Sequence, residues 1–140
     1  MQIVAVDSVG SVTFGGPAAR RMIPGLGSGV RPELLDESFV DDVVLVEEVD
    51  TIRACHRMAR RGFLFGGSTG TVVSGAMNWL ARHDGRDVTA VTIAPDLGER
   101  YLDTLYPSNW IEDLYGKNAL SLDMGAEAGP AVLGPRSPAY

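Results

Sequence analysis

Short apolar runs alternate with helical patterns along most of the sequence, and this alternation limits the possible folds more than any other feature. The runs are Ile3–Val6, Val43–Val46, Phe63–Phe65 and Val88–Ile93. Continuous apolar, β-branched runs of this length are typical of strands buried on both faces of a parallel sheet. We therefore expect an α/β fold, a three-layer sandwich with a mainly parallel sheet of about four strands.

Helical patterns lie between and after these runs. Residues 51–61 have an apolar face, with Asp50 as the expected N-cap and Gly62 as the expected C-terminal stop. Residues 71–83 carry apolar side chains at helical spacing and are expected to form the next helix. A further helix is expected near residues 99–106.

Two segments break the regular pattern. Residues 10–32 are rich in Gly and Pro, which predicts a long loop, either functional or disordered. Residues 117–140 show little periodicity, and we expect a flexible tail there. The sequence thus predicts one folded domain over residues 1–116, followed by a tail.

The overall charge makes two classes of partner poor candidates. With a net charge of -6 at pH 7 and no cluster of basic and aromatic residues, the chain is not suited to nucleic acid or anionic membranes. No apolar run approaches the roughly 20 residues of a membrane span. The single cysteine, Cys55, rules out an internal disulfide and fits a reducing compartment. We therefore expect a cytoplasmic protein with no nucleic-acid or membrane partner.

The sharpest local signal is the segment Phe63–Val72, which is typical of a strand, a glycine turn and the start of a helix. The first N–H groups of a helix have no intrahelical partner and can bind a polar or anionic group. A ligand site at Gly66–Gly70 is therefore one interpretation. The other is structural: Ser68 or Thr69 caps the helix, and the glycines permit a tight turn. The local sequence leaves both open.

The segment Gly66–Gly70 also matches the G-x-S-x-G pattern of serine hydrolases. Such an enzyme needs a histidine after the serine, with an acid between them in the chain. His83 is the only later histidine, no Asp or Glu separates it from Ser68, and it lies roughly 20 Å further along the same helix. His56 precedes the serine on another helix. A serine hydrolase is therefore a weak alternative. A P-loop is excluded because no G-K-[ST] follows the glycines, and the one Cys and two His show no metal-ligand spacing.

Three motifs in a fixed order resemble those of one enzyme family. They are Ile23-Pro-Gly-Leu-Gly-Ser-Gly, Gly66-Gly-Ser-Thr-Gly and Pro95-Asp-Leu-Gly-Glu-Arg-Tyr-Leu-Asp-Thr. Over about residues 2–115, the chain resembles the C-terminal portion of fold type II pyridoxal-phosphate (PLP) enzymes, the cysteine synthase and cystathionine β-synthase family. Within that family, the sequences of these motifs are most similar to those of the enzymes that begin 2,3-diaminopropionate synthesis for siderophores and peptide antibiotics. Those enzymes join O-phosphoserine to glutamate by β-replacement.

The resemblance implies a cofactor site around the second motif. Ser68 would place its hydroxyl against the pyridine nitrogen of PLP, and Gly66 and Gly67 would shape the same wall of the pocket. A neutral partner at this nitrogen leaves the ring a weaker electron sink, which suits β-elimination. The implied reaction is β-replacement on O-phosphoserine or O-acetylserine, with an amine or thiol nucleophile.

Four further residues are implied in this site. Gly25 and Gly27 match a loop that passes close to cofactor and substrate, where absent side chains leave room. Pro95 and Asp96 match the loop beside the ring nitrogen. The alternative for Asp96 is a cap on the helix expected near residue 99. We assign no catalytic residue and no metal ligand from the sequence.

Two parts of the family pattern do not occur in this sequence. The family attaches PLP to a lysine in a Ser-x-Lys-x-Arg type segment and holds its phosphate in a Gly-Thr-Gly-Gly-Thr type loop, and neither is present. The only lysine, Lys117, follows the last motif and is expected in solvent. We therefore expect the chain to be inactive alone.

Three accounts fit this pattern: a truncated gene, one half of a split enzyme, or a degenerate homologue that acts as a binding or regulatory subunit. A chain of this kind would expose an apolar face, because its sheet and helices are left uncovered. The expected partners are the N-terminal half of the same enzyme or further copies in a homo-oligomer, with amino acids as small-molecule substrates.

Overall fold

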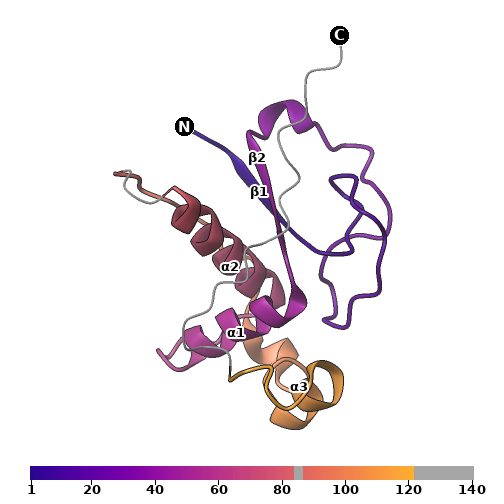
Figure 1. The fold of residues 1–140 in the computed structure, drawn as a ribbon, viewed down its shortest axis with the longest axis vertical. Helices are drawn as coiled ribbons and strands as arrows, with labels where there is room; N and C mark the ends of the chain where they lie inside the picture. The colour runs from indigo at the N-terminus through magenta and orange to yellow at the C-terminus, as the bar shows by residue number, and fades with distance from the viewer. Residues whose placement is uncertain (84–86, 122–140) are drawn as a thin grey trace.

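The computed structural model describes residues 1–83 and 87–121, and in this part of the chain the sheet has two parallel strands (Figure 1). Strand β1 (Val4–Ser8) pairs with β2 (Asp42–Val46). The register runs from Val4 opposite Asp42 to Ser8 opposite Val46. Both strands lie where the first two apolar runs predict them.

Helices make up most of the remaining regular structure. The α-helices are α1 (Glu48–Ala59), α2 (Gly67–Arg82) and α3 (Ser108–Tyr115). Two short 3-10 helices, η1 (Glu37–Phe39) and η2 (Gly98–Tyr101), lie in the connections. Together with the parallel strands, these helices confirm the α/β class predicted from the sequence.

Helix α2 covers one face of the sheet. Trp79 packs on the buried valines of β2, and its indole Nε1 donates a hydrogen bond of 2.9 Å to Asp42 Oδ2. Near the middle of the helix, Gly75 lies against β1, where an added Cβ would approach the Val6 side chain to 2.4 Å. A side chain at Gly75 would therefore force α2 away from β1.

A second core lies between α1, the start of α2, α3 and the loop that follows β1. Its most buried members are each at most 1% exposed: Ile52, Cys55, Leu105 and Ile111. Ile23 and Leu26 enter the same core from the loop. Helices α1 and α2 pack side by side, with α3 below them in the view of Figure 1. The loop is thus fixed to the helices through its apolar side chains.

The loop over residues 10–32 also has hydrogen bonds of its own. The Arg21 side chain donates from Nε to the Leu26 carbonyl at 2.8 Å. The main-chain N–H of Ser28 donates to Ser11 Oγ at 2.9 Å. The sequence leaves open whether this segment is a functional loop or a disordered one, and its hydrogen bonds and buried side chains show that it is not disordered.

The third and fourth predicted strands are wrong for the described residues. In residues 63–65, only Phe65 makes a β-bridge, an isolated antiparallel one with Leu97. Residues 88–93 have no regular structure. A strand needs a ladder of hydrogen bonds to a neighbour, and neither segment has one within residues 1–83 and 87–121.

Two helices begin earlier than the sequence predicts. In α1, Glu47 is the N-cap, and the expected cap, Asp50, lies in the first turn, where its carboxylate pairs with Arg53 Nη1 at 2.8 Å. In α2, the first helical residue is Gly67 instead of Thr71. The glycine turn expected before this helix is therefore its first turn.

The C-terminal part differs in a similar way. The helix expected near residues 99–106 is replaced by η2 and, after Pro107, by α3. Pro107 disfavours the helical conformation in the residue before it, which separates the two. Residues 117–121 form a turn in which Ala119 is buried. The remainder of the predicted tail, residues 122–140, lies outside the described residues.

Within the two described ranges, no helix is long and apolar enough to cross a membrane. The same ranges contain no group of three or more His, Cys, Asp or Glu side chains that could hold a metal ion. Cys55 is buried as a free thiol.

Candidate functional site

Three segments that are distant in the sequence meet at the N-terminus of α2. A Cβ added at Gly67 would meet Ile23 Cγ2 at 2.8 Å and Leu26 Cδ1 at 3.3 Å, so the loop after β1 packs directly on the helix start. From the other side, Asp96 Oδ2 accepts a hydrogen bond of 3.0 Å from the N–H of Ser68. The structure thus brings together the three motifs that the sequence singles out.

The Asp96 carboxylate occupies the N-terminus of α2. Besides its bond from Ser68, it accepts a hydrogen bond of 2.7 Å from the Thr69 N–H through Oδ1. The Asp96 carbonyl accepts a third, of 3.2 Å, from the Gly66 N–H. A negative charge at this position interacts favourably with the helix dipole. Asp96 therefore caps the helix in place of the N-cap residue, Gly66, which has no side chain to do so.

Two hydroxyl groups complete the surroundings of Asp96. Thr69 Oγ1 lies 2.7 Å from Asp96 Oδ1 and 2.9 Å from the Asp96 carbonyl oxygen. The Tyr101 hydroxyl donates to Asp96 Oδ2 at 2.8 Å. The close approach of the Asp96 and Tyr101 side chains to the main chain of residue 66 requires glycine there. A Cβ at this position would lie 2.3 Å from Asp96 Oδ2 and 2.4 Å from Tyr101 Cε2. Sequence reasoning did not assign Tyr101, although it lies within the third motif.

These contacts determine which groups are ionised. Partial burial raises the pKa of Asp96, but hydrogen bonds from Thr69, Ser68 and Tyr101 outweigh it and hold the pKa below its usual value. Burial, followed by the hydrogen bond to Asp96, raises the pKa of Tyr101 to about 12. Burial and the Asp96 charge raise the pKa of Cys55 to about 12 as well. Near neutral pH, the cluster therefore holds one carboxylate anion among neutral donors.

Two details predicted for the glycine motif, the free N–H groups and the helix cap at Ser68 or Thr69, are corrected by this arrangement. The N–H groups of Ser68 and Thr69 are not free for an external anion, because Asp96 accepts from both. Neither residue is the helix cap, since both lie inside the first turn. The alternative for Asp96, a cap on the helix after it, is wrong too, because its carboxylate faces α2. The bond from Ser68 to Asp96 joins residues 28 positions apart, which local patterns do not reveal.

The Ser68 hydroxyl is the polar group of this site that remains available. It makes no hydrogen bond to any residue in the described part of the chain, and Ser68 is partly exposed. Its main chain is held by Asp96, so the hydroxyl projects from a fixed position at the helix start. A hydroxyl of this kind can both donate to and accept from a ligand.

The loop glycines predicted for the site have conformational reasons to be glycine. Gly25 and Gly27 have φ angles of 77° and 63°, in the left-handed region. At Gly27 a Cβ would also lie 2.7 Å from Ser11 Cβ, whereas at Gly25 it would meet open space. Pro95 is exposed and directly precedes Asp96.

Glu48 anchors this loop to the helices. Its carboxylate accepts hydrogen bonds from the Met22 N–H at 2.8 and 2.9 Å, from the Ile23 N–H at 2.7 Å and from the Tyr115 hydroxyl at 2.9 Å. One side chain in the first turn of α1 thus holds both the loop and α3. Sequence reasoning missed Glu48, because an acidic residue in the first turn of a helix is an ordinary feature.

The other side chains considered for chemistry lie elsewhere. Lys117 is exposed, as predicted, and borders a shallow hollow with residues of α1 and α3. His56 Nε2 lies 3.0 Å from the Leu105 carbonyl oxygen, and His83 Nδ1 lies 2.7 Å from a carbonyl oxygen of its own helix. Neither contact brings a histidine to Ser68.

The described residues fit one end of PLP better than the other. The available Ser68 hydroxyl suits the pyridine nitrogen. A phosphate group needs several N–H donors, and those at the start of α2 already bind Asp96. The only lysine, Lys117, borders a hollow whose lining does not include Ser68. Among the described residues, therefore, a group suited to the ring of the cofactor is present at the start of α2, and groups for its phosphate or its covalent attachment are not.

Comparisons with known proteins identify the family of the chain. No protein-family model matches the chain. The chain is 42% identical over 120 residues to N-(2-amino-2-carboxyethyl)-L-glutamate synthase of Ralstonia nicotianae. The matched region covers 85% of this chain and 35% of that protein. Its structure resembles O-acetyl serine sulfhydrylase isoform 3 from Entamoeba histolytica, with a TM-score of 0.70, 27% identity, and coverage of 86% of this chain and 36% of that chain. It also resembles O-ureido-L-serine synthase, with a TM-score of 0.68, 28% identity, and coverage of 91% of this chain and 37% of that chain.

The chain spans about a third of the length of these relatives. The sequence relative and the solved structures belong to one family, the one that the three motifs resemble. The chain therefore belongs to the cysteine synthase family of fold type II PLP enzymes.

Proposed function

We propose that this chain forms the ring-nitrogen side of a PLP pocket in an amino-acid synthase that carries out β-replacement. The observation that carries the proposal is the Ser68 hydroxyl, which is fixed at the start of α2 and has no hydrogen-bond partner in the described part of the chain. Gly66 and Gly67 would form the wall beside it, while Asp96 holds the main chain of that wall.

The rim of the proposed pocket comes from the other two motifs. Gly25 and Gly27 lie in the loop that packs on Gly67 through its apolar residues. Pro95 lies beside the Asp96 cap and is exposed. These residues are proposed as the surface that faces the cofactor and the substrate.

PLP, when bound, supplies an electron sink for the bonds that break in the substrate. Ser68 would give the ring nitrogen a neutral partner, which leaves this sink weaker than a carboxylate partner would. A weaker sink favours loss of a leaving group from the β-carbon over reactions that keep charge on the α-carbon. Asp96, although ionised, is held by α2 and Tyr101.

The proposed substrates are O-phosphoserine or O-acetylserine, with an amine or thiol nucleophile. Support comes from the sequence relative, whose name describes a synthase of N-(2-amino-2-carboxyethyl)-L-glutamate. In that product the glutamate nitrogen carries a 2-amino-2-carboxyethyl group, which is an amino acid joined through its β-carbon. Glutamate is therefore the first nucleophile to test, and 2,3-diaminopropionate synthesis for siderophores or antibiotics is the proposed role.

We propose that the chain is inactive by itself. Its only lysine borders a hollow whose lining does not include Ser68, and the N–H groups at the start of α2 bind Asp96 instead of a phosphate. The lysine and the phosphate site would come from polypeptide that corresponds to the rest of the relatives' length.

Reconstitution tests this function. The complementing polypeptide is the part of the Ralstonia nicotianae synthase that this chain does not match. The chain and the complementing polypeptide would each be mixed with PLP, separately and together, and then supplied with O-phosphoserine and glutamate. We expect cofactor absorbance and phosphate release only from the mixture.

Replacement of Ser68 tests the placement of the pocket. In the reconstituted mixture, Ser68→Ala should keep cofactor absorbance but slow phosphate release about tenfold or more, because it removes a hydrogen bond to the ring nitrogen. The exposed Ser38 offers a matched control, and Ser38→Ala should leave the rate unchanged. An unchanged rate in Ser68→Ala would show that the serine does not face the ring. Binding without turnover would favour a non-catalytic subunit.

A further inference from the structure

The Arg21 side chain closes the loop after β1 (residues 10–32) onto itself. Its Nη1 donates hydrogen bonds to the carbonyl of Gly10, at the start of the loop, and to the carbonyl of Ala19 at 3.1 Å. Its Nε donates to the Leu26 carbonyl at 2.8 Å. Leu26 is the residue between the two glycines proposed for the rim of the pocket. One side chain therefore joins the start of the loop to the segment that would face the substrate.

A guanidinium group is suited to these contacts, and an ammonium group is not. It presents five N–H donors in a fixed planar fork, whereas a lysine has one ammonium group at the end of a flexible stem. All three acceptors of Arg21 are main-chain carbonyls. In residues 1–83 and 87–121, no carboxylate forms an ion pair with Arg21. Within this part of the chain, Arg21 therefore holds the course of the main chain and does not neutralise an acid.

Two glycines let the loop approach the Arg21 side chain closely. A Cβ at Gly27 would lie 3.2 Å from Arg21 Nε and 2.7 Å from Ser11 Cβ. A Cβ at Gly10 would lie 2.9 Å from Ala19 Cβ. The two turns of the loop can close on the guanidinium because side chains are absent at these positions.

We name residues 24–27 the loop tip, and this segment is held on both sides. Before it, the Glu48 carboxylate holds the main chain of the loop. After it, Ser11 Oγ accepts a hydrogen bond of 2.9 Å from the N–H of Ser28. Arg21 holds the tip itself, while both of its glycines are exposed. The tip thus presents its main chain to solvent in a shape that side chains outside it determine.

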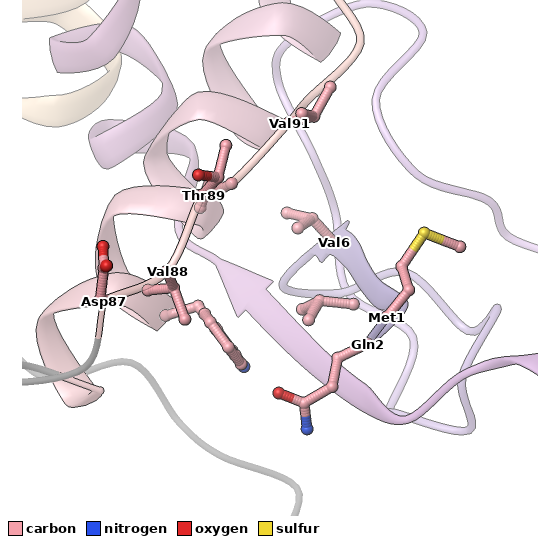
Figure 2. Close-up of a pocket in the computed structure, with 11 residues that line it drawn as sticks. Met1, Gln2, Val6, Asp87, Val88, Thr89 and Val91 are labelled. Atoms are coloured by element: carbon pink, nitrogen blue, oxygen red, sulfur yellow. The ribbon is translucent and has the colours of Figure 1, made fainter.

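An open cavity beside β1 lies apart from the candidate site (Figure 2). Its volume is about 460 Å³, and it is formed by β1 and the residues before it, by α2 and by residues 87–91. Its lining includes neither Ser68 nor any residue of the loop tip. The loop tip packs instead on Gly67, the residue before Ser68. On this chain the loop tip, and not the cavity, therefore borders the candidate site.

We propose that Arg21 is a positioning residue for the proposed β-replacement. It fixes the loop tip in the conformation that the amino-acid substrate meets, and it acts through the main chain of the tip without touching the substrate. This inference rests on the proposed function for the identity of the reaction. A surface that is ordered before binding spares the substrate the entropic cost of ordering it.

This role predicts a specific kinetic effect. If loss of the three hydrogen bonds leaves the loop tip in the required shape for only about a tenth of the time, the apparent affinity for the substrate falls about tenfold. The substrate that binds still meets the same shape, so kcat is nearly unchanged. Partial unfolding has the opposite effect, because fewer active molecules lower the apparent kcat and leave KM as it was.

Kinetics of the reconstituted mixture test this effect. Arg21→Lys keeps the charge but removes the fork, and the exposed neighbour gives the matched control, Arg20→Lys. With O-phosphoserine and glutamate varied in turn, Arg21→Lys should raise the KM of at least one of them about tenfold and change kcat less than about threefold. The control should behave like the unchanged chain. A lower kcat with unchanged KM values, or no kinetic change at all, overturns the inference.

Hydrogen exchange in the free chain gives a readout that needs no catalysis. Arg21→Lys should speed the exchange of the N–H groups of Ala19 and Ser28, which donate to the Gly10 carbonyl and to Ser11 Oγ. The main-chain N–H of Trp79, in α2, should exchange as before. Faster exchange of Trp79 as well would show general unfolding and would contradict a local role.

A second variant loosens the loop tip from its other side. Ser11→Ala removes the acceptor for the Ser28 N–H and should raise the same KM as Arg21→Lys, again with kcat nearly unchanged. If Arg21→Lys does not fold, Ser11→Ala decides, and an unchanged KM then overturns the inference.

The inference and the proposed function fail in different ways. If the unchanged chain releases no phosphate in the mixture, the proposed function is wrong and the inference falls with it. If the mixture is active but Arg21→Lys has normal KM values, Arg21 does not position the substrate and the proposed function stands. The same holds if exchange at Ala19 becomes faster without any change in KM.

Discussion

Asp96 Oδ1 lies 2.7 Å from both the main-chain nitrogen and the hydroxyl oxygen of Thr69. The two residues are 27 positions apart, so this contact joins the C-terminal segment to the start of α2. The same carboxylate accepts from the N–H of Ser68, the residue whose hydroxyl is the proposed cofactor contact. The Asp96 cap is therefore a feature on which both stability and the geometry of Ser68 depend.

Removal of the charge at Asp96 should destabilise the chain in a pH-dependent way. The folded-state pKa of Asp96 is lowered, so its stabilising contribution is present above the unfolded-state pKa near 3.8 and is lost as pH falls through the lower folded-state value. At pH 7, Asp96→Asn should cost about 1–2 kcal/mol of unfolding free energy. Urea unfolding between pH 3 and pH 7 should show this difference shrinking toward the acid end, while the exposed Asp113→Asn shows none.

Gly75→Ala should reverse the usual preference of helices for alanine. In an exposed helix interior, alanine is about 1 kcal/mol more favourable than glycine. At Gly75, however, a Cβ would lie 2.4 Å from the Val6 side chain, and overpacking costs about 1–3 kcal/mol. We expect a net loss of stability in thermal or urea unfolding. Gly29→Ala, where a Cβ meets open space, serves as the control, and a stabilised Gly75→Ala would show that α2 and β1 are not in this contact.

Glu48→Ala should release the loop without unfolding α1. The substitution removes the acceptor for the N–H groups of Met22 and Ile23 and for the Tyr115 hydroxyl. Hydrogen bonds to a charged group contribute about 1.5–3 kcal/mol each when measured singly, so local opening near Met22 should become much more frequent. Hydrogen exchange of these two N–H groups measures the effect. The exposed Glu112→Ala should leave their exchange unchanged.

Cys55 should be unreactive in the folded chain. Its side chain is fully buried, its thiol donates to the Gly66 carbonyl at 3.3 Å, and burial raises its pKa to about 12. The thiolate is the reactive form, so a thiol reagent at pH 8 should label Cys55 only as fast as the chain opens. Labelling should become immediate in denaturing urea. Rapid labelling of the native chain would contradict the packing of Cys55 between α1 and the start of α2.

The sequence is most informative where local chemistry decides the outcome. The runs around Val4 and Val44 become β1 and β2, and the helical spacing that includes Trp79 becomes α2. The order of the three motifs predicts a shared site, and the structure does place Ile23, Gly67 and Asp96 together. The proposed contacts with PLP remain predictions.

The sequence is least informative where a distant group completes the structure. Residues 88–93 have the composition of a strand, but a strand forms only with a neighbour to pair with. The cap of α2 comes from Asp96, 28 positions after Ser68, so the local pattern at the glycine turn shows N–H groups that look free. The role of Glu48 is hidden from local patterns for the same reason, because its hydrogen bond from the Tyr115 hydroxyl joins residues 67 positions apart.

The internal cap on α2 has a consequence for the order in which a complete enzyme would assemble. Because Asp96 neutralises the helix start, this chain cannot retain a phosphate ester there by itself. We therefore expect PLP and the complementing polypeptide to bind cooperatively, each raising the affinity of the chain for the other by the same factor. Excess chain would then leave the cellular pool of free cofactor undiminished, since only the paired polypeptides could draw on it.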